Sequence, residues 1–186
     1  MIKKKKKLNI KQKRELLRIA REAVENFVMT GHAPKLDVVD AMLNEQSGAY
    51  VTLKKDGEIR GSIGQIVPSE KPLWQVVRDS AMAACCEDPR FKPITKKELP
   101  ELVYEISVLT KPELIDSWRR IKPGRHGVVV QKGLQGGVYL PQTAEENGWT
   151  REEFIEHLCC EKAGLAKECY KNDPDLQLQI FEAQVF

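Results

Sequence analysis

One glycine-rich segment combines residue types that could bind an anion. Residues 59–64 read IRGSIG, and a regular strand would place Arg60, Ser62 and Gly64 on one side. A guanidinium and a hydroxyl would then flank a surface floored by glycine, which suits a phosphate or carboxylate. Two glycines weaken a strand, so something is expected to approach its backbone closely. A β-bulge or bend with a solvated Arg60 is the alternative interpretation.

A second polar segment lies at residues 87–91 and reads EDPRF. It follows a predicted helix, which should end there because the residue before a proline avoids the helical conformation. In one interpretation Asp88 and Arg90 form a local ion pair at this turn. In the other, Arg90 points into a cleft and binds a ligand.

Glu105 is a candidate for acid–base chemistry because it occurs in the middle of a predicted strand with a partly apolar face. A carboxylate in such a place is either paired or has a raised pKa. Pairing with Arg60 or Arg90 would make Glu105 structural, and this interpretation is favoured because an unpaired buried charge is costly. A desolvated Glu105 would be a candidate general base.

His126 is the histidine that sequence context favours for function. It stands between glycines in the loop at residues 124–127, which read GRHG. Loop residues at strand ends often form sites, but a histidine there can equally fix the loop through backbone hydrogen bonds. His32 follows a helix stop, and His157 is assigned to the surface of the helix that begins at Thr150. A Ser62–His126–Glu105 triad has no local support, since Arg60 stands where a nucleophile elbow needs glycine.

The elements that must position these residues follow from hydrophobic periodicity, turn residues and capping patterns. Helices are predicted over residues 9–29, 72–86 and 150–163, with stops at Gly31 and Gly164. Strands are predicted over residues 49–53, 58–66, 101–109, 127–131, 137–140 and 176–185. Asp56-Gly57 predicts a hairpin turn, residues 114–118 a short helix, and the broken alternation at Ile180-Phe181 a bulge. This order predicts an α+β fold with a mainly antiparallel sheet and flanking helices on one side.

The composition is that of a globular protein. The chain has 186 residues, of which 41% are hydrophobic and 31% charged, and no apolar run is long enough to span a membrane. The net charge of +3 depends on Lys3–Lys7, because 25 basic and 27 acidic residues remain without them. Residues 1–8 are therefore predicted to be a flexible basic tail, and a nucleic-acid partner is not expected of the body. Because no apolar stretch follows the basic start, a signal peptide is not expected. A cytoplasmic location is expected instead.

The five cysteines are expected to be reduced thiols. They include two adjacent pairs and no Cys-x-x-Cys, so no metal site is predicted. Neither a Walker A sequence nor a Gly-x-Gly-x-x-Gly fingerprint occurs, and no cofactor is evident.

Seven segments together resemble the AMMECR domain family, whose bacterial and archaeal members are also called AmmeMemoRadiSam system protein A. They occur in the family's order and comprise RGSIG at 60–64, EDPRF at 87–91, EISVL at 105–109, GRHG at 124–127, LPQ at 140–142, GW at 148–149 and KAGL at 162–165. The resemblance runs from about Leu16 to the C-terminus. It departs at Ser62, where the family usually has cysteine. Serine keeps hydrogen bonding but lacks a readily formed thiolate, which argues for binding rather than nucleophilic chemistry at this position.

The resemblance implies a single α+β domain over residues 9–186, with two unequal lobes, a cleft between them and an inserted small lobe. The family that the chain resembles is biochemically uncharacterised, so whether the protein is an enzyme stays open. In the first hypothesis the cleft binds an anionic small molecule through Arg60, Ser62, Arg90, Gln142 and Lys162, with Glu105 and His126 as acid–base candidates.

Two further functions remain as alternatives. One is a non-catalytic partner or adaptor of Memo-like and radical S-adenosylmethionine proteins, which predicts an exposed apolar patch near Trp74, Trp118 or Trp149. The other is a nucleic-acid binder that uses the lysine tail and an arginine-lined cleft, which predicts binding that weakens steeply with salt and with removal of Lys3–Lys7.

Overall fold

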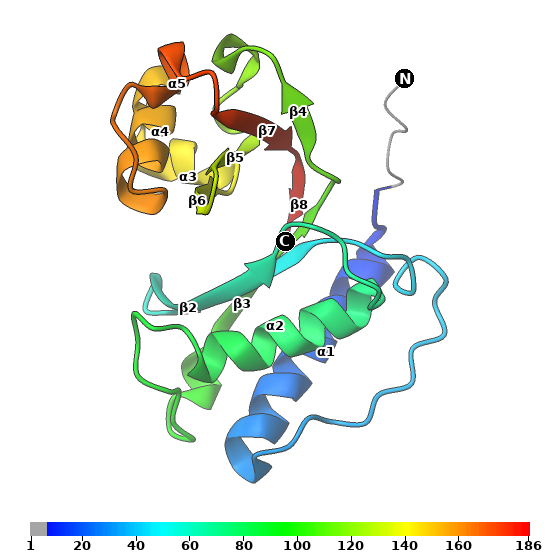
Figure 1. Ribbon diagram of the computed structural model, residues 1–186. Helices are drawn as coiled ribbons and strands as arrows, with labels where there is room; N and C mark the ends of the chain where they lie inside the picture. Colours follow the sequence, from blue (N-terminus) through cyan, green and yellow to red (C-terminus); the bar gives the residue numbers. More distant parts are fainter. Residues whose placement is uncertain (1–6) are drawn as a thin grey trace. The chain divides into compact units, whose positions relative to one another are not determined.

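The computed structural model describes residues 7–186, and the chain forms two compact units. The first unit extends to Leu109 and includes Gln184–Phe186, whereas the second comprises Thr110–Ala183. Each unit has its own antiparallel sheet and its own hydrophobic core (Figure 1). The predicted α+β fold is confirmed, but two four-stranded sheets replace the one sheet that the sequence suggested.

The elements follow one another in this order along the chain: α1 (Ile10–Thr30), β1 (Ala49–Lys55), β2 (Glu58–Gln65), α2 (Leu73–Cys86), a 3₁₀ turn (Leu99–Glu101), β3 (Val103–Leu109), β4 (Glu113–Ile115), a second 3₁₀ turn (Trp118–Arg120), β5 (Gly127–Lys132), β6 (Gln135–Tyr139), α3 (Gln142–Asn147), α4 (Arg151–His157), a π-helix (Leu158–Lys162), α5 (Cys169–Asn172), β7 (Gln177–Phe181) and β8 (Ala183–Val185). The first sheet has the order β2-β1-β3-β8 and the second β4-β7-β5-β6.

The long helix α1 forms where the sequence predicts it. The Asn9 side chain caps the amide of Gln12, whose own side chain returns a bond to the Asn9 amide. Its end is set by Gly31, which adopts a left-handed conformation with φ of 77°. Leu8, assigned to the tail by its charge context, is buried and donates its N–H to the Gln184 side chain. Residues 1–6, which hold most of the predicted tail, lie outside the described residues.

Helices α1 and α2 pack against one face of the first sheet (Figure 1). The hairpin between β1 and β2 turns at Asp56 and Gly57, which both have positive φ as a tight turn of this kind requires. Val51, Leu53 and Ile106 face the helices and are fully buried. Side chains alternate along strands, so the intervening positions of β1, β2 and β3 belong to the opposite face.

The second unit packs its helical segment 151–162 against β5, β6 and β7. Phe154, Ile155 and Leu158 are fully buried together with Val128 and Val130 of β5. The helix begins at a capping box between Thr150 and Glu153, as predicted. It changes to a π-helix at Leu158, which the sequence did not reveal, and helices α3 and α5 were also not predicted.

Two predicted elements are wrong in detail. Residues 113–115 form strand β4, and only residues 118–120 make a helical turn, so the short helix expected near 114–118 is absent from its predicted place. The last strand does not bulge within one sheet. It breaks at Glu182, so that β7 belongs to the second sheet and β8 to the first. The break is held by Thr110, whose N–H donates to the Glu182 carbonyl and whose hydroxyl accepts the Glu182 N–H.

None of the helices in residues 7–186 combines the length and the apolar character that crossing a membrane requires.

Candidate functional site

The seven predicted site residues are divided between the two units. Arg60, Ser62, Arg90 and Glu105 belong to the first unit, and His126, Gln142 and Lys162 belong to the second.

Asp88 is the centre of the polar group in the first unit, although it was predicted only as an ion-pair partner. Its carboxylate accepts the backbone N–H of Ser62 at 2.8 Å and the backbone N–H of Arg90 at 3.1 Å. It also receives a two-pronged bond from the Arg90 guanidinium, with Nε at 3.0 Å and Nη2 at 2.7 Å. The Arg90 guanidinium, together with these amides, lowers the pKa of Asp88 to about 2. The Asp88 side chain is 3% exposed and that of Arg90 is 49% exposed.

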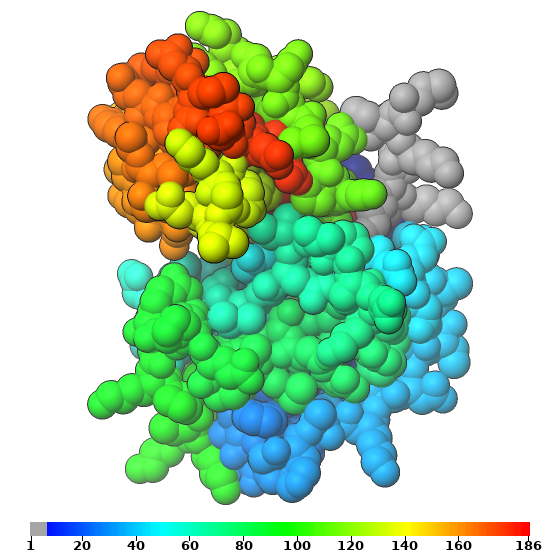
Figure 2. Space-filling model, in the orientation of Figure 1, coloured from blue at the N-terminus to red at the C-terminus, as the bar shows by residue number. Residues whose placement is uncertain are grey.

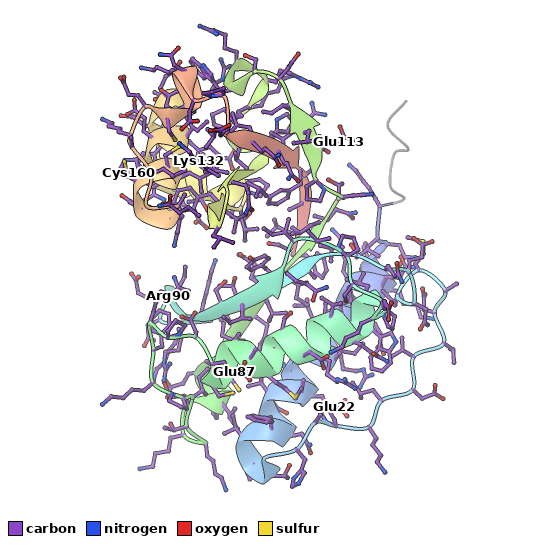
Figure 3. The ribbon with its side chains drawn as sticks, viewed as in Figure 1. Glu22, Glu87, Arg90, Glu113, Lys132 and Cys160 are labelled. Carbon is purple, nitrogen blue, oxygen red and sulfur yellow. The ribbon has the colours of Figure 1, made fainter. Side chains whose placement is uncertain are left out.

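The loop that carries this pair lies at the surface of the first unit, in green in Figure 2, and Arg90 is labelled in Figure 3. The loop is anchored by Ile94, which is buried and donates its N–H to the Cys85 carbonyl at 2.8 Å. Between residues 90 and 97 it carries four basic side chains and no acidic one: Arg90, Lys92, Lys96 and Lys97.

Arg60 has a structural environment that differs from the regular strand considered above. The pairing of β1 with β2 shifts after Leu53, which lies opposite Gly61, while Lys54 lies opposite Ile59. Arg60 is thus the extra residue of a bulge, as the alternative interpretation expected, but its side chain is 19% exposed and paired where that interpretation expected it to be solvated. Its Nε donates to Glu98 at 2.8 Å and its Nη1 to the Lys92 carbonyl at 2.7 Å.

Glu98 is held as an ion by these contacts. Burial favours its neutral form, but bonds from the Thr95 amide and the Arg60 guanidinium prevail and lower the pKa of Glu98 to about 2. The Arg60–Glu98 pair therefore fastens the loop to β2.

The glycines of β2 are explained by packing. A Cβ at Gly61 would lie 2.0 Å from the Ala84 carbonyl oxygen of α2, and one at Gly64 would lie 2.5 Å from Cα and Cγ of Tyr50. The close backbone approach inferred from the sequence is therefore found: α2 lies against Gly61, and β1 lies against Gly64. Burial raises the pKa of Tyr50, whose side chain lies against Gly64.

On the face of the sheet opposite the helices, two pairs of polar side chains lie next to each other. Thr52 and Ser62 are register partners, and their hydroxyl oxygens are 2.9 Å apart. Glu105 is the register partner of Thr52 on β3, and its carboxylate binds the Lys54 ammonium at 2.8 Å. Glu105 is thus paired, as favoured above, but with Lys54 in place of an arginine.

In the second unit, His126 lies at the end of the loop that leads into β5. It is 9% exposed, and its Nδ1 accepts the Lys122 N–H at 3.3 Å. Burial and the neighbouring Arg125 charge lower the pKa of His126, so the neutral ring is favoured. This environment matches a histidine that fixes its loop through the backbone.

Gln142 and Lys162 belong to different helical segments. Gln142 is the first residue of α3 and is half-buried, whereas the Lys162 ammonium lies 5.6 Å from the centre of the Tyr139 ring. The Tyr139 hydroxyl donates to Glu161 at 2.8 Å. Glu161 also binds His157, whose ring stacks on Trp149 with centroids 4.2 Å apart.

Sequence reasoning missed the central role of Asp88 and the contributions of Thr52 and Glu98. The signal for Asp88 was present, since an Asp-Pro pair directly after a helix often carries a side chain that bonds to nearby amides. No signal marked Glu98, because its partner Arg60 lies 38 residues away along the chain. Within residues 7–186 no cluster of three or more metal-binding side chains occurs.

The alternative functions stay predictions. Of the tryptophans suggested for a docking patch, Trp74 is 8% exposed and belongs to the first core, while Trp118 and Trp149 are partly buried against the second. Most of the lysine run lies outside the described residues.

The fold defines an α+β protein with two antiparallel sheets, and the described side chains assign no reaction. A sequence model of the AMMECR1 family matches residues 17–186, so the chain belongs to that family, as the resemblance predicted. A protein of Nanoarchaeum equitans is 37% identical over 179 residues, covering 92% of this chain and 97% of that protein. A protein of Methanopyrus kandleri is 38% identical over 189 residues, covering 97% of this chain and 90% of that protein.

The fold has been seen in a solved structure as well. The crystal structure of an uncharacterized protein from Pyrococcus horikoshii matches with a TM-score of 0.86 at 37% identity, covering 92% of this chain and 88% of that one. Family membership therefore establishes the fold and leaves the ligand, reaction and partners to be inferred from the site.

Proposed function

We propose that the protein binds an anionic small molecule, bearing a carboxylate or a phosphate, at the edge of β2 in the first unit. The observation that carries this proposal is the Asp88 clamp. One buried carboxylate holds the Ser62 amide and the Arg90 guanidinium, so the guanidinium is fixed beside Ser62 while half of its side chain remains exposed.

The fixed guanidinium suits anion binding because little conformational freedom is left to lose. Asp88 engages Nε and Nη2 of Arg90, and no partner for Nη1 is found among residues 7–186. A planar guanidinium presents several donors, and the outer ones match the oxygens of a carboxylate or phosphate. Preorganisation of this kind raises affinity by lowering the entropy lost on binding.

The charge of the loop adds to the attraction. Asp88 offsets the charge of Arg90, so Arg90 alone would give a weak field. Lys92, Lys96 and Lys97 are exposed neighbours in the same loop and carry additional positive charge. Glu98 is offset by Arg60, and Glu87 is the remaining acid of the segment, so the three lysines leave an excess of positive charge that favours an approaching anion, more strongly at low salt.

The Thr52–Ser62 hydroxyl pair supplies a neutral donor close to the guanidinium. A bond between two hydroxyls uses one of their two hydrogens, and the second can donate elsewhere. Thr52 is 5% exposed while Ser62 is half-buried, so the Ser62 hydroxyl is the accessible one. The Ser62 amide and Arg90 Nη2 bind the same Asp88 oxygen, which places them within two hydrogen-bond lengths of each other.

The proposal is limited to binding. Glu105, the candidate base of the first unit, is engaged by Lys54, and the neutral His126 is engaged by its loop backbone. Neither arrangement supports assigning a proton-transfer step.

Calorimetric titration with inorganic phosphate and with citrate tests the proposal. Arg90→Ala should weaken binding of at least one probe about tenfold or more, because a charge-assisted hydrogen bond is lost. Ser62→Ala keeps the amide that Asp88 needs and should weaken binding severalfold. Arg90→Lys keeps the charge without the planar fork and should fall between the wild type and Arg90→Ala.

Arg18→Ala is the matched control. The Arg18 side chain is also 49% exposed and is paired with Glu15 and Glu22 in the same unit, but it lies on α1. Circular dichroism of every variant checks the fold. Equal affinities of folded Arg90→Ala and wild-type protein, or an equal loss in Arg18→Ala, would contradict the proposal.

A further inference from the structure

Two thiols from separate segments of the second unit are in direct contact. Cys159 belongs to the π-helix and Cys169 begins α5, ten residues later. The Sγ of Cys169 donates to the Sγ of Cys159 across 2.9 Å. Cys85 and Cys86, in contrast, both donate to the Met82 carbonyl.

The contact is supported by the surrounding backbone. The Leu165 N–H donates to the Cys159 carbonyl at 2.8 Å, which fixes the turn that leaves the π-helix. Beyond this turn, Lys167 forms an ion pair with Glu156 of α4 at 3.0 Å. The segment that carries Cys169 is therefore held against the helical segment that carries Cys159, and a disulfide requires the two sulfurs to approach from 2.9 Å to about 2.05 Å.

We propose that Cys159 and Cys169 are a redox pair that closes to a disulfide by exchange with a small-molecule disulfide. Cys169, after losing its proton to water, attacks one sulfur of the small disulfide and breaks its S–S bond. One small thiolate leaves and takes up a proton. Cys159, also deprotonated by water, then attacks the Cys169 sulfur and expels the second small thiol. Two protein thiols are oxidised, and one small disulfide is reduced to two thiols.

The order of the steps follows from access and environment. Cys169 is half-buried, while Cys159 is fully buried. Burial, and secondarily the contact with Cys169, raise the pKa of Cys159, which disfavours it as the first nucleophile. Lys132, labelled in Figure 3, binds Asp173 at 2.5 Å, and its pKa is raised by Asp173 and more weakly by the charge of Cys169. Cys169 is the more accessible of the two thiols and therefore meets the small disulfide first.

Cys160 is the competing thiol that the experiment must separate from Cys159. It is exposed, directly follows Cys159 and is labelled in Figure 3. Oxidised glutathione is therefore applied to the full chain and to the single variants Cys160→Ser, Cys159→Ala and Cys169→Ser. After thiol blocking, trypsin separates residues 152–162 from residues 168–171, and mass spectrometry detects the two peptides when they are cross-linked.

The wild type and Cys160→Ser should both give the cross-linked peptide, with a mass lower by two hydrogens than the reduced pair, and dithiothreitol should reverse it. Cys159→Ala and Cys169→Ser should give none. In Cys159→Ala, Cys169 should instead retain glutathione as a stable mixed disulfide. An unchanged circular dichroism spectrum then shows that this variant reacts as a folded protein. A cross-link that persists in Cys159→Ala but disappears in Cys160→Ser would overturn the assignment. Absence of any cross-link in wild type and Cys160→Ser would overturn the redox pair itself.

Discussion

The Asp88 carboxylate joins the loop after α2 to the edge strand β2 by accepting the Ser62 backbone N–H at 2.8 Å. An edge strand has amides with no partner in the sheet, and Asp88 satisfies one of them. The same oxygen also accepts Arg90 Nη2, so one side chain completes the sheet edge and orients the cation of the proposed site. Stability and binding are therefore coupled at Asp88.

Asp88→Asn should reduce the acid sensitivity of the protein. The pKa of Asp88 in the folded protein, about 2, lies below the unfolded value of about 4, so its contribution is fully present above pH 4. That contribution is lost as the pH falls from about 4 to about 2. The asparagine variant should be less stable at pH 7 by about 1 kcal/mol, since solvent screens the half-exposed Arg90. Denaturant unfolding at several pH values measures this.

The difference in stability between wild type and Asp88→Asn should shrink across this window and vanish only below pH 2. Glu98 titrates in the same window in both proteins and cancels in the comparison. Asp79→Asn, which removes a carboxylate paired with Lys71 and Arg78, serves as control, and a loss of the pH dependence as large as that in Asp88→Asn would contradict the assignment to Asp88. A constant difference from pH 7 to pH 2 would speak against the clamp.

Arg60→Ala should loosen the loop that carries Arg90. The substitution leaves Glu98 without its cation and the Lys92 carbonyl without its donor, which should cost about 2 kcal/mol. Hydrogen exchange of the Ile94 and Thr95 amides should accelerate, because the Thr95 amide is bonded to Glu98 and the Ile94 amide anchors the loop to the Cys85 carbonyl of α2.

Arg120→Ala removes an exposed pair with Asp116 and should change neither stability nor exchange measurably. Unchanged exchange of Ile94 in Arg60→Ala would show that the Arg60–Glu98 pair does not hold the loop.

Gly137→Ala should destabilise the second unit more than Gly136→Ala. A Cβ at Gly137 would lie 2.5 Å from Lys162 Cβ, against the π-helix, whereas a Cβ at Gly136 would meet only the Val130 carbonyl oxygen and the Gln131 side chain, at 3.0 Å or more. Overpacking of this kind costs about 1–3 kcal/mol. Thermal unfolding of the two variants measures the difference, and equal losses would mean that β6 and the π-helix are less closely packed than described.

Thr52 and Ser62 should be energetically coupled. Ser62→Ala leaves the nearly buried Thr52 hydroxyl without this partner and should lower the free energy of unfolding by about 1 kcal/mol. Thr52→Val combined with Ser62→Ala removes both hydroxyls of the bond. A double-mutant cycle in denaturant should give a coupling energy of about 0.5–1 kcal/mol. The stability of Ser62→Cys should fall between those of the wild type and Ser62→Ala, because a thiol is a weak hydrogen-bonding group. A coupling energy of zero would show that the bond between the two hydroxyls does not stabilise the fold.

The fold could be predicted where local signals decide it. The capping box at Thr150, the helix stop at Gly31 and the Asp56-Gly57 turn each depend on a few neighbouring residues, and each was placed correctly. The crossing of the last strand between two sheets could not be predicted in this way. It depends on Thr110 meeting Glu182, 72 residues away.

The candidate site shows the same limit. The sequence identified Arg60, Ser62 and Arg90 as residues of interest, and the structure brings all three to one edge of the first unit through Asp88 and the loop. The ion-pair partners of Arg60 and Glu105 could not be assigned. Arg60 binds Glu98 because it lies in a one-residue bulge, and Glu105 binds Lys54 because of the register of the strands. Both outcomes depend on pairing between distant segments, which periodicity does not encode.

Nitrogen-detected or amide-detected NMR during titration with inorganic phosphate tests the central claim most directly. The Arg90 Nε–H and Ser62 backbone amide resonances should shift together and saturate, while the Arg18 Nε–H resonance should stay in place. The shift of the Ser62 amide should disappear in Arg90→Ala. Resonances of Arg90 and Ser62 that do not respond, at phosphate concentrations that move other amides, would contradict an anion site at this edge of the sheet.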